Sequence, residues 1–138
     1  MTTQTNWFPG HLRVLTDDEC LELLNEFTVG RVAWNEPEGP IVVPVNYAME
    51  GTSIVFRTSL DTKLARQLHL GFASFQIDEH DDFTQSGWSV LVRGVLSCVE
   101  AHGTEKDDAR VVPWAEGERH YLMRITPLII TGRRIIPT

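Results

Sequence analysis

The segment SIVFRTSLDTKL brings two cations and two hydroxyls to the end of an expected strand. Arg57, Thr58 and Ser59 close the apolar run, and Lys63 follows in the first turn of an expected helix. Helix N-termini carry unpaired N–H groups and a partial positive charge, so they suit a phosphate group, and Arg57 could bind two of its oxygens. A cation in a first helical turn is unfavourable unless an anion is bound there. One interpretation is therefore a phosphate site.

The same residues also allow a purely structural interpretation. Ser59 or Asp61 would cap the helix, while Arg57 and Lys63 would be solvated or would pair with acids. Because caps of this kind are common, the segment taken alone slightly favours this second interpretation.

The segment VPVNYA places a proline in the middle of an expected strand. Pro44 cannot donate a hydrogen bond to a neighbouring strand, so this strand lies at an edge or is bulged there. Backbone groups left free by the interruption, together with the Asn46 amide, could bind the polar edge of a flat ring. The alternative, which the segment alone favours, is an edge strand protected against aggregation.

The segment SGWSVLVRG starts a strand with a large aromatic residue and carries an arginine in an apolar run. Trp88 could stack on a planar ligand or fill a dimer interface. Arg93 needs an anionic or carbonyl partner if it is buried. A core tryptophan with an arginine that extends to solvent explains the pattern equally well.

Composition limits the class of protein. The 138 residues carry a net charge of −7, which argues against nucleic-acid binding because that binding depends on Lys and Arg. Two cysteines and five histidines show no zinc-ligand spacing, so we expect no metal site. No leader pattern or membrane-length apolar run is present, so we expect a soluble, cytoplasmic protein.

The hydrophobic periodicity predicts one mainly β domain over residues 1–138, with an N-terminal arm at 1–10. A capping box at TDDE starts a short helix that ends by Gly30, and a second helix is expected over 60–71. The acidic stretch 78–87 is expected to be a loop, and Gly94 to mark a bulge or a close backbone approach. Six strands in an antiparallel, closed or nearly closed barrel are expected, at 31–35, 40–49, 53–59, 72–79, 88–101 and 119–130.

In this order the segments VGRVAW, PIVVPVNYAMEGTSIVFRTSLDTKL, FASFQIDE, GWSVLVRG and RITPLIITGRRI resemble the pyridoxamine 5'-phosphate oxidase-like family of flavin-binding split β-barrels. The resemblance covers residues 15–136. It implies a six-stranded antiparallel Greek-key split barrel and a homodimer with two FMN molecules between the subunits. It further implies three groups of cofactor-binding residues: a phosphate cradle at Arg57, Thr58, Ser59 and Lys63, a strand along the flavin ring at Pro44, Val45 and Asn46, and contacts from the neighbouring subunit at Gly87, Trp88 and Ser89.

One position departs from the family pattern. Many relatives have glycine between the RT pair and the lysine, whereas here Leu60, Asp61 and Thr62 fill that turn and bring a carboxylate beside the phosphate site. Some members of the family prefer a deazaflavin or handle haem. We therefore expect an FMN-dependent oxidoreductase acting on a small organic substrate, with a non-catalytic flavin, deazaflavin or haem binding or sensor protein as the alternative. A third possibility is a dimer without cofactor that has an interaction role, with Trp88 in the core of the interface and Arg57 and Lys63 solvated. In each case we expect a dimer, because Trp7, Trp88 and Trp114 are candidates for exposed apolar surface.

Overall fold

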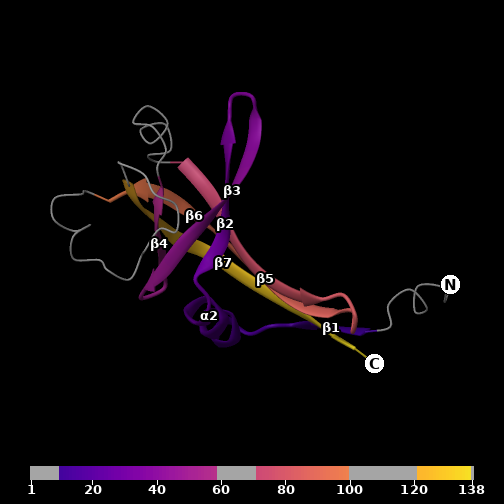
Figure 1. Ribbon diagram of the computed structural model, residues 1–138. Coiled ribbons are helices and arrows are strands. Elements are labelled where there is room, and N and C mark those ends of the chain that lie inside the picture. The colour runs from indigo at the N-terminus through magenta and orange to yellow at the C-terminus, as the bar shows by residue number, and fades with distance from the viewer. Residues whose placement is uncertain (1–9, 59–70, 100–120, 138) are drawn as a thin grey trace.

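The computed structural model describes residues 10–58, 71–99 and 121–137 (Figure 1). Within these ranges the chain forms one helix and seven strands, all of whose pairings are antiparallel. The elements are β1 (Gly10–Val14), α2 (Asp17–Glu26), β2 (Val29–Glu36), β3 (Gly39–Glu50), β4 (Ser53–Thr58), β5 (Gly71–Asp81), β6 (Ser86–Cys98) and β7 (Tyr121–Pro137).

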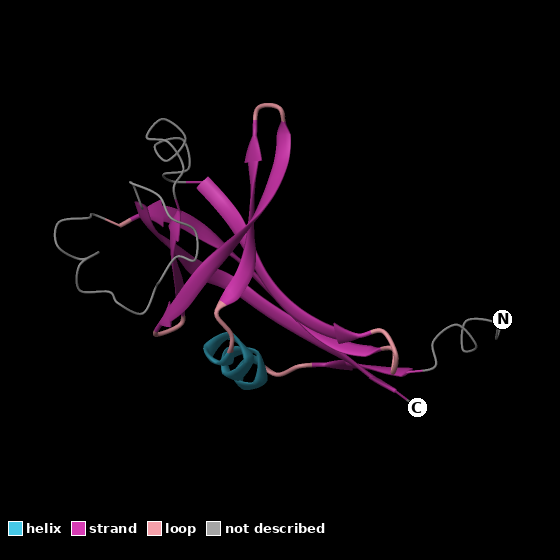
Figure 2. Cartoon of the chain, viewed as in Figure 1, coloured by secondary structure: helices cyan, strands magenta, loops and turns pink. Residues whose placement is uncertain are grey.

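The sheet closes on itself. Its order is β1-β7-β4-β3-β2-β5-β6, and β6 also pairs with β7, so strands β2 to β7 form a six-stranded barrel (Figure 2). These six are the predicted strands, and the expected mainly β split-barrel class is confirmed. The seventh strand, β1, was not predicted. It pairs along the C-terminal part of β7, from Gly10 opposite Pro137 to Val14 opposite Arg133, so the expected arm already becomes a strand at residue 10.

Helix α2 begins where the sequence predicted. The Thr16 hydroxyl accepts a hydrogen bond from the Glu19 amide at 3.2 Å, and the Glu19 carboxylate accepts one from the Thr16 amide at 2.9 Å. The helix ends at Glu26, earlier than expected, because Phe27 is already extended. Gly30 lies in β2, where an added Cβ would come within 2.2 Å of the Phe75 ring. Close packing, not helix termination, explains this glycine.

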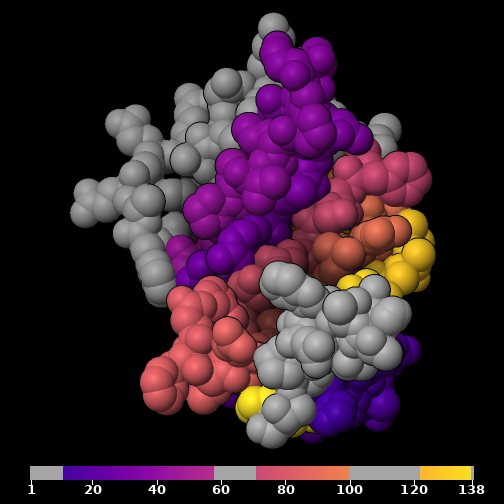
Figure 3. Space-filling model, turned by 90° about the vertical axis from the view of Figure 1, so that its right-hand side faces the viewer, coloured from indigo at the N-terminus to yellow at the C-terminus, as the bar shows by residue number. Residues whose placement is uncertain are grey.

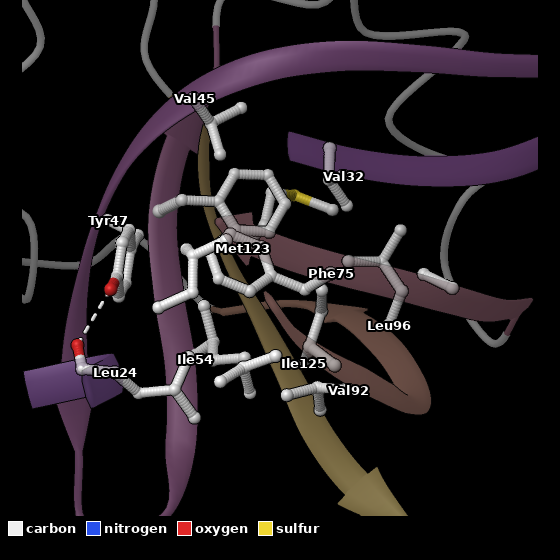
Figure 4. Close-up of a cluster of buried hydrophobic side chains, with 14 of the residues drawn as sticks. Leu24, Val32, Val45, Tyr47, Ile54, Phe75, Val92, Leu96, Met123 and Ile125 are labelled. Carbon is white, nitrogen blue, oxygen red and sulfur yellow. Dashed lines mark hydrogen bonds between the residues drawn. The ribbon is translucent and has the colours of Figure 1, made fainter. Parts of the chain in front are cut away.

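The barrel interior is filled by side chains from every strand of the barrel and from α2 (Figure 4). Tyr47 packs edge-on against Phe75 with ring centroids 4.8 Å apart, and its hydroxyl donates to the Leu24 carbonyl at 2.7 Å. This hydrogen bond joins the end of the helix to β3. A second buried cluster, centred on Val55 and Leu122, lies on the opposite side of β4 and β7.

Gly94 marks a bulge, as predicted. The register between β6 and β7 shifts between Arg93, opposite Ile129, and Gly94, opposite Pro127, so Leu128 is an extra residue in β7. An added Cβ at Gly94 would lie 2.2 Å from the Thr126 carbonyl oxygen. The bulge also accommodates Pro127, which cannot donate to a regular ladder.

Two further predicted boundaries were wrong. Most of the acidic stretch expected as a loop is strand, because β5 continues to Asp81 and β6 starts at Ser86. The side chains from Asp78 to Gln85 are all exposed to solvent, so the local sequence pattern resembles that of a loop. Strand β7 extends to Pro137 because β1 and β6 pair with its end. The helix expected over 60–71 lies outside the described residues except for Gly71, which begins β5.

Candidate cofactor site

Three predicted site residues share the outer face of β3 and β4. Val45 and Tyr47 point into the barrel, so Pro44 and Asn46 alternate outward. Phe56 is buried opposite Tyr47 in the ladder, so Asn46 and Arg57 are the next positions on the two strands. Pro44 is exposed, while Asn46 and Arg57 are half-buried. The fold thus brings an amide and a guanidinium together on one surface.

Pro44 lies at an edge and not at a bulge. It stands opposite Arg31 in β2 without a break in register. On the other side, β4 pairs with β3 only from Tyr47 onward, so within the described chain the first half of β3 has one neighbouring strand. The backbone edge of this half-strand faces away from the barrel ladder, beside Asn46.

The phosphate end of the predicted site is described only in part. Thr58 is the last residue of β4 and pairs with Tyr121, and Arg57 pairs with Leu122 on β7. Ser59 and Lys63 lie outside the described residues.

Val45 belongs to the group on β3. Its side chain is 8% exposed and packs in the barrel core, so only its backbone is available at the open edge of the strand.

Residues 87–89 divide between the two faces of β6. The Trp88 side chain is 8% exposed and packs on Phe27 with ring centroids 5.1 Å apart, so the core interpretation holds for this ring. The expectation of an exposed Trp88 was wrong, because strand alternation turns it inward. Gly87 and Ser89 alternate to the outer face, and so does Arg93, which is exposed.

The two groups of predicted residues lie far apart on this face. Pro44, Arg31, Gln76 and Leu91 are in one row across β3, β2, β5 and β6. Three inter-strand spacings of about 4.8 Å separate β3 from β6, or ~14 Å along the sheet. A small ring bound at the edge of β3 is therefore not enclosed by residues 87–89 of the same subunit.

Arg31 is a feature that the motif analysis missed. Its guanidinium donates to Gln76 and to Asp78, each at 3.0 Å, and it lies directly opposite Pro44. The alternation of Arg31 with buried Val32 and Trp34 was the available signal for its place on the outer face. These two hydrogen bonds hold the Arg31 side chain in place on the outer face, next to the open edge of β3.

Beyond these residues, the described part of the chain offers few other groups that could do chemistry. Among the described residues, no buried side-chain nitrogen or oxygen lacks a hydrogen-bond partner, and no three His, Cys, Asp or Glu residues gather as a metal site would require. Cys20 is a fully buried core residue, and burial raises the pKa of its thiol, which disfavours the reactive thiolate. In the described ranges no helix has the length and apolar character to cross a membrane.

Comparison with known proteins agrees with this architecture. A candidate pyridoxamine 5'-phosphate oxidase from Corynebacterium glutamicum superimposes with a TM-score of 0.79 at 28% identity, over 92% of this chain and 95% of that one. The FAD-binding protein of Mycobacterium smegmatis gives a TM-score of 0.68 at 29% identity, over 90% and 98% of the two chains. The uncharacterized protein Rv0080 of Mycobacterium tuberculosis is 27% identical over 128 residues, which cover 88% of this chain and 84% of that protein.

The family assignment rests on a match along nearly the whole sequence. The sequence model of the pyridoxamine 5'-phosphate oxidase family matches residues 16–134. This range includes all the predicted site residues, and those that the structure describes lie in β3, β4 and β6. The chain belongs to the pyridoxamine 5'-phosphate oxidase family.

Proposed function

We propose that this protein is a homodimeric, FMN-dependent oxidoreductase that acts on a small organic substrate. The observation that carries the proposal is the shared outer face of Pro44, Asn46 and Arg57 beside the open edge of β3. The FAD-binding relative from Mycobacterium smegmatis, 29% identical, supports a flavin as the ligand. The low cysteine content, two in 138 residues, supports a cytoplasmic location for the enzyme.

The residues fit the parts of a flavin mononucleotide. Arg57 would bind the phosphate together with Thr58, Ser59 and Lys63, since a guanidinium and hydroxyls match its oxygens. The backbone edge at Pro44 and Val45, with the Asn46 amide, would meet the polar edge of the ring. The flavin, when bound, supplies the redox chemistry, and the protein supplies anchoring and orientation.

The ~14 Å between β3 and β6 supports a shared site. Gly87, Trp88 and Ser89 of the partner subunit would cover the ring that β3 of the first subunit holds, through the outer-facing Gly87 and Ser89 and the backbone of Trp88. Each dimer would then hold two cofactors, one at each copy of the interface.

The test is a titration of the purified protein with FMN, followed by flavin fluorescence. The double substitution of Arg57→Ala and Lys63→Ala should weaken FMN binding by about a hundredfold or more, because each charged contact contributes on the order of 1.5–3 kcal/mol. Arg13→Ala removes one exposed cation that pairs with Glu19 at 3.1 Å, and it should leave FMN affinity unchanged. Unchanged affinity in the double variant would place the phosphate site elsewhere.

A second candidate is a non-catalytic binding or sensor protein. The name of the Mycobacterium smegmatis relative specifies binding and no reaction, and the face at β3 and β4 fits a flavin equally well in that role. Parallel titrations with FMN, FAD, a deazaflavin and haem identify the ligand. Reduction of the bound flavin by a nicotinamide donor, and reoxidation by an acceptor, supports the oxidoreductase, whereas a bound ligand that does not turn over supports the binding protein.

A further inference from the structure

A hollow of about 390 Å³ opens on the outer face, beside the turn end of the β2–β3 hairpin. Figure 3 shows this side of the molecule, with the violet hairpin beside parts of β5, β6 and β7 in pink, orange and yellow. One row of the sheet forms its floor, with Ala33 opposite Ser74, Ser74 opposite Arg93, and Arg93 opposite Ile129. The hollow is therefore built on strands, not on loops.

Exposed apolar side chains line the hollow. Phe72 is 77% exposed, Leu128 64% and Ile129 53%, and all three line the hollow. Leu128 is the extra residue of the β7 bulge, so the irregularity at Gly94 determines the shape of the rim. Trp34 also lines the hollow, and its indole N–H donates to Glu36 at 3.0 Å.

Arg93 is the charged group of the hollow. Its side chain is exposed, and among the described residues it has no hydrogen bond or ion pair. Arg13, Arg31 and Arg124 differ, since each pairs with a carboxylate. None of the described residues that line the hollow is acidic, although the whole chain carries a net charge of −7. A positive group set in apolar walls is complementary to an anion with an apolar body.

We propose that this hollow binds a small planar organic anion, an aromatic carboxylate of one or two rings. Arg93 would bind the carboxylate through its two-pronged guanidinium, and Phe72, Leu128 and Ile129 would contact the ring. The volume lies within the range of small-molecule sites, roughly 300–1,000 Å³. Arg57 and Asn46 do not line the hollow, so this site goes beyond the proposed flavin site and does not depend on it.

The proposal is tested with two probes that differ in charge, 2-naphthoate and 2-naphthalenemethanol. Calorimetric titration of the protein should show naphthoate binding at least about tenfold tighter than the alcohol, the scale of one charge-assisted hydrogen bond. Arg93→Gln should remove this difference. Arg133→Gln neutralises another exposed arginine on the same face, outside the hollow, and should keep it. The titrations are run with and without FMN, and circular dichroism verifies the fold of both variants.

Several results would overturn the proposal. One is an absence of naphthoate binding, and another is equal affinity for the two probes. Displacement of naphthoate by FMN would mean that the probe occupies a flavin site. If naphthoate does not bind and Arg93→Gln converts a dimer to a monomer in light scattering, the hollow is an interface between copies of the chain.

One result would support the independence of the two sites. The Arg57/Lys63 double variant should lose FMN binding while its naphthoate binding stays intact.

Discussion

At the scale of single residues, the phenol of Tyr47 links helix α2 to the barrel. Its hydroxyl donates to the Leu24 carbonyl at 2.7 Å inside the core. Tyr47→Phe leaves that carbonyl near the end of the helix without this partner, so we expect a loss of about 1–3 kcal/mol in the free energy of unfolding. Urea denaturation measures it, and Thr131→Val, at an exposed strand position, is the control. A loss no larger than in the control would mean that water replaces the hydrogen bond.

The same tyrosine predicts a pH dependence. Burial raises the pKa of the Tyr47 phenol well above its ordinary value. Since the folded protein then holds this proton more tightly than the unfolded chain, its contribution to stability is complete below about pH 10 and falls as the pH rises further. The stability of the wild type should therefore decline more steeply than that of Tyr47→Phe above that pH. Parallel slopes for the two proteins, in denaturation series across this range, would contradict the assignment.

Gly94 tests the bulge. A Cβ added there would meet the Thr126 carbonyl oxygen at 2.2 Å, and this oxygen belongs to the backbone of the neighbouring strand. Gly94→Ala must shift the β6–β7 pairing, so we expect a loss of about 1–3 kcal/mol in thermal or chemical unfolding. Ser97→Ala, on the same strand and half-buried, serves as the control. Equal stability of the two variants would show that the bulge yields at little cost.

At the scale of elements, the capping box determines where α2 begins. Thr16→Ala removes the side-chain acceptor for the Glu19 amide and should lower the free energy of unfolding by about 1 kcal/mol. Hydrogen bonding from the Thr16 backbone, followed by that from Arg13, lowers the pKa of Glu19. This stabilisation is present above the unfolded pKa and is lost as the pH falls through the folded one. Thr16→Ser keeps the hydroxyl acceptor and should retain most of the stability that Thr16→Ala loses. A Ser variant that is as unstable as the Ala variant would argue against the cap.

Elements with a local chemical signal could be predicted from sequence. The capping box, the proline at the β3 edge and the glycine at the β6–β7 bulge each act through the backbone within a few residues, so their effect is visible in the sequence. Strand β1 and the end of β7 have no such signal, because each is a strand only through pairing with the other. The prediction was wrong for the acidic end of β5 for the same reason, because this segment is held extended by pairing with β6 and not by a preference of its own residues.

The candidate site could be predicted as a set of residues but not as a surface. Alternation along β3 and β4 assigns Asn46 and Arg57 to the outside only once the register of Tyr47 with Phe56 is known. Trp88 shows the limit most clearly. The residues around it in the sequence are compatible with a ring on either face of the strand. The ring lies on the inner face, where it packs on Phe27, a residue distant in the sequence.

At the scale of the whole molecule, the outer face continues beyond the barrel. Strands β5, β6, β7 and β1 run together toward one end of the molecule, where β1 begins at Gly10 and β7 ends at Pro137 (Figure 1). Leu12 is 63% exposed, Val14 75% and Ile135 45%, and Leu12 stands opposite Ile135 in the ladder. Two copies that pack these faces together through a two-fold axis would cover apolar surface and bring residues 87–89 of each toward the β3 edge of the other.

This arrangement predicts that dimerisation and FMN binding fail together. Leu12→Asp places a charge in the apolar part of the face, so the dissociation constant of the dimer should rise at least about tenfold, and FMN affinity should fall because the partner's contacts are lost. Phe83→Asp is the matched control, since Phe83 is 96% exposed in the turn between β5 and β6. Light scattering across a concentration series, read beside the FMN titration, separates the possible results. A wild-type monomer that binds FMN, or a Leu12→Asp monomer that keeps full affinity, would show that one subunit holds the cofactor alone.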